Sequence, residues 1–357
     1  MKLFRCDCDA QIFFENTQCL SCGRELGFIP SQFELSALPN GSTEFMVAGS
    51  AWRKCRNYSH EGVCNWMSPT RSPSDLCQAC EFNHVIPDLS EAENRALWLE
   101  VERSKRRLIY SLNRLGLPVI PKTIDPGNGL SFDIKASSGH ERVLTGHLDG
   151  NITLNLAEAD PAQREQVRMA MRERYRTLLG HFRHEIGHYY FGLMVHEPYI
   201  LARCRERFGD ESVDYGEALK EHYGQANHLM YQDAFISSYA MAHPSEDFAE
   251  TFAHYLHMVD TLETALEFGF VSERLTKAFP QIQASFDLLM REWMGLSIAL
   301  NSLNRSMGLL DAYPFSISEK VGEKLRFIHD LIHSLEQSAS MPRSSESVAA
   351  APQLAAP

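Results

Sequence analysis

The sequence predicts an α+β protein in which a small, cysteine-rich N-terminal region precedes a larger, mostly helical domain with a small antiparallel sheet. Three observations predict this fold class. Eight of the nine cysteines lie before residue 81, apolar residues recur at helical spacing over much of the rest, and alternating apolar residues flank one Asp-Gly pair. We expect the cysteine-rich region at 1–88, the helical domain at 89–337 and a disordered tail rich in Ser, Ala and Pro at 338–357.

Length and charge limit the classes of function. A chain of 357 residues is long enough for two domains, and its formal net charge of -12 disfavours nucleic acid or an anionic membrane as the main partner. No apolar run approaches the roughly 20 residues of a membrane span. The first residues also lack the hydrophobic segment of a signal peptide. We therefore expect a cytoplasmic protein with neither a nucleic-acid nor a membrane partner.

The paired cysteines predict two structural zinc sites, because disulfides are rare in the cytoplasm and C-x-x-C knuckles direct two thiolates at one ion. Interleaved pairing of the two sets stays open, as does replacement of a thiolate by His60 or His84. A redox-active thiol pair is disfavoured, because both knuckles lack the usual βα context. The first expected site is formed by Cys6, Cys8, Cys19 and Cys22, and the second by Cys55, Cys64, Cys77 and Cys80.

The charge of residues 1–80 bears on what these zinc ribbons contact. Seven Lys or Arg stand against eight Asp or Glu in this stretch, so it has no basic excess with which to neutralise phosphates. A protein partner or a purely structural role is therefore favoured for the ribbons.

The next segments predict a long helix followed by strands. Ser90 and Glu93 have the spacing of a capping box, which opens a helix that ends at Gly116 and whose charges we expect on a solvated face. Residues 130–134 alternate like a half-buried strand. Asp149-Gly150, between 143–148 and 152–156, predicts a two-residue hairpin. Together they predict a small, largely antiparallel sheet.

The most informative stretch is His184-Glu185-Ile186-Gly187-His188. Apolar residues at three- and four-residue steps predict one amphipathic helix that begins with Asp160 as N-cap and ends near Gly192. On a helix, His184 and His188 lie on one face and can bind a single metal ion. Glu185 lies beside that ion, where it could act on a metal-activated water.

A catalytic zinc needs a third protein ligand. A metzincin is excluded, because Phe191 and Met194 stand where that class has glycine and histidine. A second helix that starts at Pro244 offers Glu246 as ligand and Glu250, on the same face, as acceptor of a hydrogen bond from a ligand imidazole. His254 is the main rival ligand, and a solvated acidic first turn is the non-functional interpretation.

Two resemblances extend this interpretation. Tyr239, Glu246-x-Phe248-Ala249-Glu250 and the histidine motif resemble the gluzincin metallopeptidases of the lethal-factor type. The cysteine knuckles, with residues 86–90 and 152–155, resemble a bacterial family of zinc-ribbon-bearing, zinc-binding metallopeptidases, over residues 1 to about 335. The resemblance implies a zincin-like fold, Glu246 as third ligand, Glu250 as its supporting partner and Tyr239 as oxyanion donor. The long separation between His188 and Glu246 departs from thermolysin-like enzymes, so their substrate geometry does not carry over.

We therefore expect a zinc-dependent peptidase with Glu185 as general base, one catalytic zinc and two structural zincs. Its substrate would be a peptide or protein, and its zinc ribbons could contact a protein partner. Two alternatives stay open: a zinc-stabilised interaction module with an inactive peptidase-like domain, and a metal-dependent amidase that acts on a non-peptide substrate.

Overall fold

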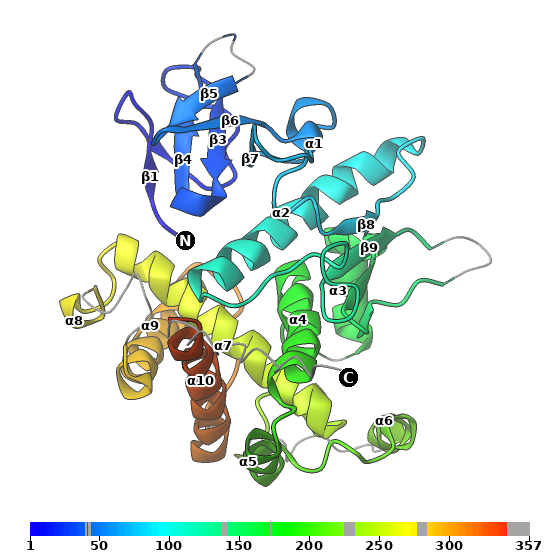
Figure 1. The fold of residues 1–357 in the computed structure, drawn as a ribbon. Helices are drawn as coiled ribbons and strands as arrows, with labels where there is room; N and C mark the ends of the chain where they lie inside the picture. Colours follow the sequence, from blue (N-terminus) through cyan, green and yellow to red (C-terminus); the bar gives the residue numbers. More distant parts are fainter. Residues whose placement is uncertain are drawn as a thin grey trace, which may run out of the picture.

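The computed structural model describes residues 1–39, 41, 44–137, 142–171, 173–224, 233–276 and 284–340. A region of short strands lies against one side of a larger helical body, and the long helix α2 (Ala92–Arg114) runs between them (Figure 1). The predicted α+β fold class is confirmed. None of the helices in these ranges has the length and apolar character needed to cross a bilayer.

The N-terminal region consists of short antiparallel strands. Its strands are β1 (Phe4–Arg5), β2 (Gln11–Ile12), β3 (Leu26–Ile29), β4 (Glu34–Ala37), β5 (Glu44–Val47), β6 (Ser50–Lys54) and β7 (Met67–Pro69), with the short helices η1 (Pro30–Gln32) and α1 (Arg56–Ser59) between them. Such strands bury little surface alone. Instead, Phe14 and Phe28 pack on Tyr110 of α2, and one hydrophobic core continues from this region into the helical domain.

Helix α2 differs from expectation at its start and on one face. Glu91 is the N-cap, and Ser90 hydrogen-bonds to the Asp88 carboxylate instead of capping the helix, so the expected capping box is wrong. The helix ends as predicted before Gly116, which has a φ of 63°. The expectation of a wholly solvated charged face is also wrong, because three charged side chains of α2 are buried. They are Glu102, Lys105 and Arg106.

A four-stranded sheet lies beside the helical body. Its strands are β8 (Asn83–Val85), β9 (Ser131–Lys135), β10 (Gly146–Leu148) and β11 (Asn151–Asn155), in the order β10-β11-β9-β8. The β10–β11 hairpin is antiparallel as predicted, with Asp149 and Gly150 at φ values of 47° and 78°. Unlike the largely antiparallel pattern expected, β9 pairs in parallel with both β11 and β8. Parallel pairing needs a long crossover, which α2 supplies between β8 and β9.

The predicted motif helix is in fact two helices, α3 (Pro161–Ala170) and α4 (Leu178–Met194). Asp160 caps the first as predicted, and η2 (Leu156–Ala159) precedes it. A second cap was not expected: the Thr177 hydroxyl accepts a hydrogen bond from the Gly180 N–H and starts α4. The helical spacing of apolar residues continues through the break, so the spacing did not reveal that α3 ends. Val167 and Met171, which are part of this apolar pattern, are exposed.

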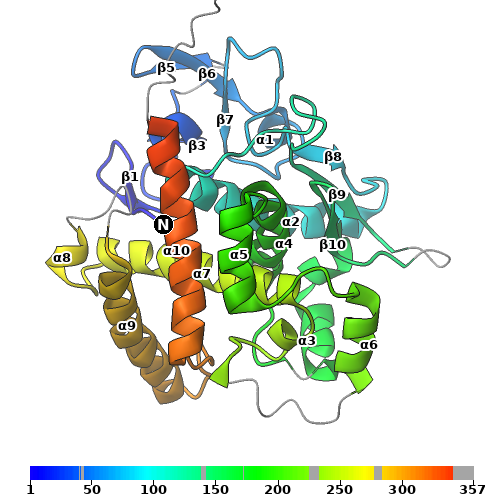
Figure 2. The same ribbon diagram turned by 60° about the horizontal axis from the view of Figure 1, so that its bottom comes forward.

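The remaining helices form the helical body. They are α5 (Pro198–Phe208), α6 (Tyr215–Gly224), η4 (Tyr239–Met241), α7 (Pro244–Glu267), α8 (Glu273–Thr276), α9 (Phe286–Ser306) and α10 (Glu319–Ser340). Helix α7 runs through the middle of this body and crosses α4 (Figure 1), and α5 lies beside α10 (Figure 2). Helix α10 continues past residue 338, where the tail was expected to start, and residues 341–357 lie outside the described ranges.

A close approach between α4 and α7 fixes the geometry of the histidine motif. A Cβ added at Gly187 would lie 2.9 Å from the Cα and 3.0 Å from the carbonyl oxygen of Ala249. Real Cβ atoms rarely approach backbone this closely, so the absence of a side chain at residue 187 lets the two helices touch.

We predict that Gly187→Ala destabilises the protein, because the added methyl group must push α4 away from α7. The expected loss in free energy of unfolding is about 1–3 kcal/mol, measured by urea or thermal unfolding. Gly192→Ala on the same helix is the matched control, because its Cβ would meet nothing within 4 Å. That variant should be neutral or up to about 1 kcal/mol more stable. Equal effects of the two substitutions would contradict the close-packing argument.

Candidate metal centres and active site

The two motif histidines lie one turn apart on α4 with their rings converging. The Nε2 atoms of His184 and His188 are 3.2 Å apart. His184 is buried, and so is Glu185 next to it in the sequence. The α4 backbone therefore places both imidazoles at one point with a carboxylate beside them, as the four-residue spacing predicts.

Helix α7 brings a carboxylate to the same point. Glu246 lies in its first turn, where Pro244 occupies the first helical position and the His243 ring caps the helix by accepting from the Ser245 N–H. The Oε2 atom of Glu246 is 3.0 Å from Nε2 of His184 and 3.4 Å from Nε2 of His188. The three side chains can thus offer one ligand atom each to a shared ion.

The donor set fits zinc. Tetrahedral bonds of about 2.0–2.2 Å place ligand atoms roughly 3.3–3.6 Å apart, close to the separations of this cluster. The buried Oε2 of Glu246 has no hydrogen-bond partner of proper geometry among the described residues, although both rings are near it. Burial alone would raise the pKa of Glu246, but the two imidazoles outweigh burial and lower it. An ionised, unsatisfied carboxylate oxygen is what a metal cation would complete.

Glu250, one turn further along α7, contacts the other ring nitrogen of His184. Its Oε1 lies 2.7 Å from His184 Nδ1, and its Oε2 accepts a hydrogen bond from the Ser237 hydroxyl at 2.6 Å. Burial raises the pKa of Glu250, yet interaction with His184 outweighs this and lowers it to about 2. A carboxylate on Nδ1 favours a proton there, which would leave the Nε2 lone pair available to bind a metal ion.

The rival ligand lies elsewhere. The Nδ1 atom of His254 hydrogen-bonds the Tyr313 hydroxyl at 2.8 Å, and its ring packs edge-on against Phe315. Burial lowers the pKa of His254 to about 4. It is therefore a neutral histidine in an aromatic setting and is not part of the His184, His188 and Glu246 cluster.

Tyr239 lies beside the cluster. It belongs to η4, and its ring centroid is 5.8 Å from that of His184. Burial, and after it the charge of Glu246, raises the pKa of Tyr239, so the hydroxyl keeps its proton at neutral pH. A protonated phenol at this position can donate a hydrogen bond to a group bound next to His184, His188 and Glu246.

Sequence reasoning missed three residues around the site. The Tyr215 hydroxyl, from α6, donates to Oε1 of Glu246 at 2.8 Å. Ser237 supports Glu250, and His147 on β10 stacks against His188 with centroids 6.4 Å apart. Burial, together with His188, lowers the pKa of His147 to about 4, so its ring is neutral. These residues carry no spacing signal, because each comes from a separate part of the chain that only folding brings near the cluster.

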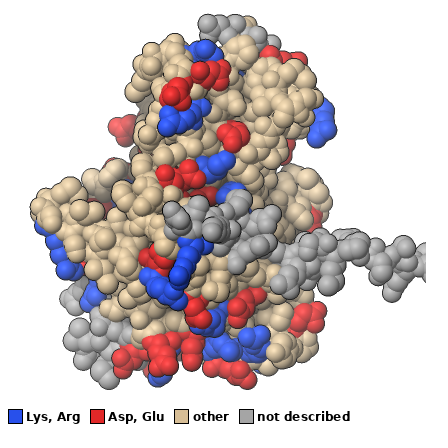
Figure 3. Space-filling model, turned by 90° about the vertical axis from the view of Figure 1, so that its left-hand side faces the viewer, with Lys and Arg blue, Asp and Glu red and all other residues tan. Residues whose placement is uncertain are grey.

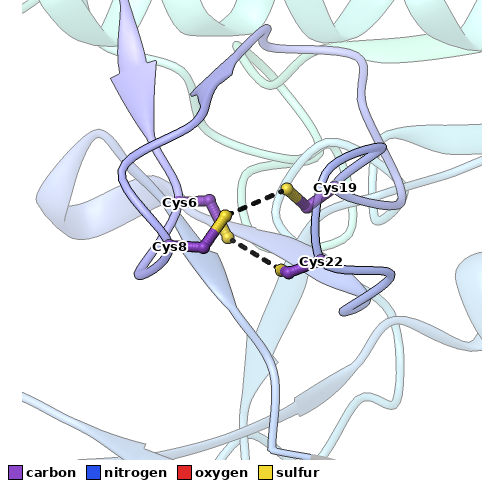
Figure 4. A group of neighbouring side chains, drawn as sticks. All are labelled: Cys6, Cys8, Cys19 and Cys22. Carbon is purple, nitrogen blue, oxygen red and sulfur yellow. Dashed lines mark hydrogen bonds between the residues drawn. The ribbon is translucent and has the colours of Figure 1, made fainter.

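The first cysteine cluster lies in the N-terminal region, at the loops after β1 and before β3. The Sγ atoms of Cys6 and Cys22 are 3.6 Å apart, as are those of Cys8 and Cys19 (Figure 4). Tetrahedral zinc with Zn–S bonds of about 2.3 Å places sulfurs about 3.8 Å apart, so the four thiols fit one ion. Cys8 and Cys22 are exposed.

The second cluster is wholly buried. Cys55, Cys64, Cys77 and Cys80 come together, with Cys64 Sγ 3.7 Å from Cys77 Sγ and 3.8 Å from Cys80 Sγ. The two sets thus group in chain order rather than interleaved. The two alternative histidines have other partners, because His60 contacts the Ser59 hydroxyl and His84 contacts Asp133.

The buried charges of α2 lie against this second cluster. Arg106 donates to the Val63 carbonyl, next to Cys64, and a Glu102 oxygen is 3.9 Å from Cys80 Sγ. Lys105 pairs with Glu102 at 2.8 Å. Four thiolates around a divalent ion carry a net charge of about −2. With Lys105 paired to Glu102, the Arg106 guanidinium offsets part of that charge, which explains why a cation is buried here.

Comparison with known proteins agrees with both kinds of site. Residues 94–331 match the family described as "putative zinc-binding metallo-peptidase", and residues 3–91 match a zinc-ribbon domain. The chain is 43% identical over 335 residues to an uncharacterized protein of Mycobacterium bovis and to uncharacterized proteins from two strains of Mycobacterium tuberculosis. Each match covers 93% of this chain and 95% of the relative. No solved structure gives a significant match.

We predict that Arg106→Leu destabilises the second cysteine cluster, because it leaves the buried negative charge uncompensated. The free energy of unfolding should fall by about 3–5 kcal/mol, and zinc should be released faster to a chelator. Arg103→Leu is the control on the same helix: Arg103 is 42% exposed and pairs only with Glu100 among the described ion pairs. It should change stability by no more than about 0.5 kcal/mol. Similar losses in both variants would refute a specific role for Arg106.

Proposed function

Because the chain belongs to the zinc-binding metallopeptidase family, we propose that it is a zinc-dependent peptidase whose ion is held by His184, His188 and Glu246. One observation carries the proposal: two imidazoles and an unsatisfied buried carboxylate oxygen from a different helix converge, with Glu185 alongside. In this arrangement a glutamate completes the ligand set, as in gluzincins.

The chemistry divides between the ion and the chain. When bound, zinc supplies a water whose pKa is near 7 and polarises the carbonyl of the scissile bond. Glu185 accepts the proton of the attacking water and returns it to the leaving amine, a role worth about 100- to 10,000-fold in rate. Tyr239 donates a hydrogen bond to the developing oxyanion. Glu250, itself held by Ser237, keeps the His184 ring in its ligating orientation.

The proposed substrate is a peptide or protein, in line with the family. The two ribbon sites would have different roles. The second, buried against α2, is structural, whereas the first has exposed cysteines and is the candidate surface for a protein partner.

The surface charge does not favour a nucleic-acid partner, because Lys or Arg and Asp or Glu are interspersed on the face that Figure 3 shows. Nine unbridged cysteines favour the cytoplasm.

The test is Glu185→Gln, assayed against a peptide library with metal analysis. This variant should keep its zinc, because residue 185 is not a ligand, and should lose at least about 100-fold in turnover. Glu197→Gln, at a side chain 67% exposed at the start of α5, is the matched control and should cleave normally. Wild-type turnover by Glu185→Gln would remove Glu185 from the mechanism. A wild-type protein that cleaves only non-peptide amides would change the substrate class, and one that cleaves nothing would favour an interaction module.

A further inference from the structure

The two oxygens of Glu246 have separate surroundings. Oε2 faces the imidazole pair, while Oε1 accepts a hydrogen bond from the Tyr215 hydroxyl at 2.8 Å. Tyr215 is the first residue of α6, it lies 31 positions before Glu246 in the sequence, and it is 44% exposed. A partly exposed side chain is therefore hydrogen-bonded to a buried carboxylate.

The segment that leads into α6 is tied to the start of α7. His243 accepts from the Ser245 N–H at Nδ1, so its Nε2 carries the proton and donates to the Val213 carbonyl at 3.2 Å. The Tyr215 ring packs edge-on against His243 with centroids 5.2 Å apart. The start of α7, which carries Glu246, thus also holds the segment that positions Tyr215.

We propose that Tyr215 is a positioning residue that occupies Oε1 of Glu246, so that this glutamate ligates the ion through Oε2 alone, and that metal binding and the docking of α6 are coupled. The proposal rests on the proposed function. A carboxylate that ligates with both oxygens would use the position that a catalytic zinc keeps open for water. Coupling is reciprocal: if Tyr215 strengthens metal binding, the metal must strengthen the docking of α6 by the same factor.

The experiment measures zinc affinity by chelator competition in the wild type, Tyr215→Phe and the control Tyr199→Phe. Tyr199 lies on α5, is 72% exposed, and its ring lies under Arg203. Tyr215→Phe should weaken zinc binding at the histidine site about 10- to 100-fold, the usual effect of removing a hydrogen bond to a metal ligand, and leave the ribbon zincs unchanged. Tyr199→Phe should match the wild type. Equal affinity in all three proteins would overturn the proposal.

A second measurement needs no variant of Tyr215. Hydrogen exchange of the α6 amides should slow when zinc is returned to wild-type protein whose histidine site has been stripped. Unchanged exchange would contradict the coupling. The variant His184→Ala distinguishes failure of the proposed function from failure of the role of Tyr215. If the wild type binds no more zinc ions than His184→Ala, the proposed function is refuted. If the wild type binds one zinc ion more than His184→Ala, and Tyr215→Phe binds that ion as tightly as the wild type, only the role of Tyr215 is refuted.

Discussion

The contact between α4 and α7 is the constraint on which the site depends. The histidine pair belongs to one helix and Glu246 to the other, and nothing local in the chain holds them together. The absence of a side chain at Gly187 lets α4 rest on the backbone of α7 at Ala249. Because the helices touch there, residues within one turn of the contact meet across it. Glu246 reaches the Nε2 atoms of His184 and His188, and Glu250 reaches the Nδ1 atom of His184.

The N-terminal region also packs against the helices that form the site. Its second cysteine cluster lies against α2, and its aromatic residues share the hydrophobic core of the helical domain. Helix α2 in turn packs on α4, so the buried thiols support the helix that carries the histidines. In the first cluster, Cys6 and Cys19 belong to the same hydrophobic core, but Cys8 and Cys22 are exposed. Two sites of identical ligand type thus have different physical surroundings.

Much of the site could be predicted because its residues are related by fixed spacings. Helical periodicity alone placed His184 with His188 and Glu246 with Glu250, and close pairs of cysteines indicated the clusters. The residues that were missed lack such spacing. Ser237 and Tyr215 reach the cluster from an irregular segment and from the start of α6, where position depends on tertiary contacts. The break between α3 and α4 was missed because apolar spacing persists across it, and the burial of Arg106 because charge normally signals exposure.

We propose that α7 completes a metal centre to which α4 contributes two histidines. The most direct test is the number of zinc ions per chain in the wild type and in Glu246→Ala, measured by elemental analysis after removal of loosely bound metal. The three ligand clusters found among the described residues predict three zinc ions in the wild type and two in the variant, with both cysteine clusters still filled. A Glu246→Ala protein that keeps three zinc ions as tightly as the wild type would contradict the claim.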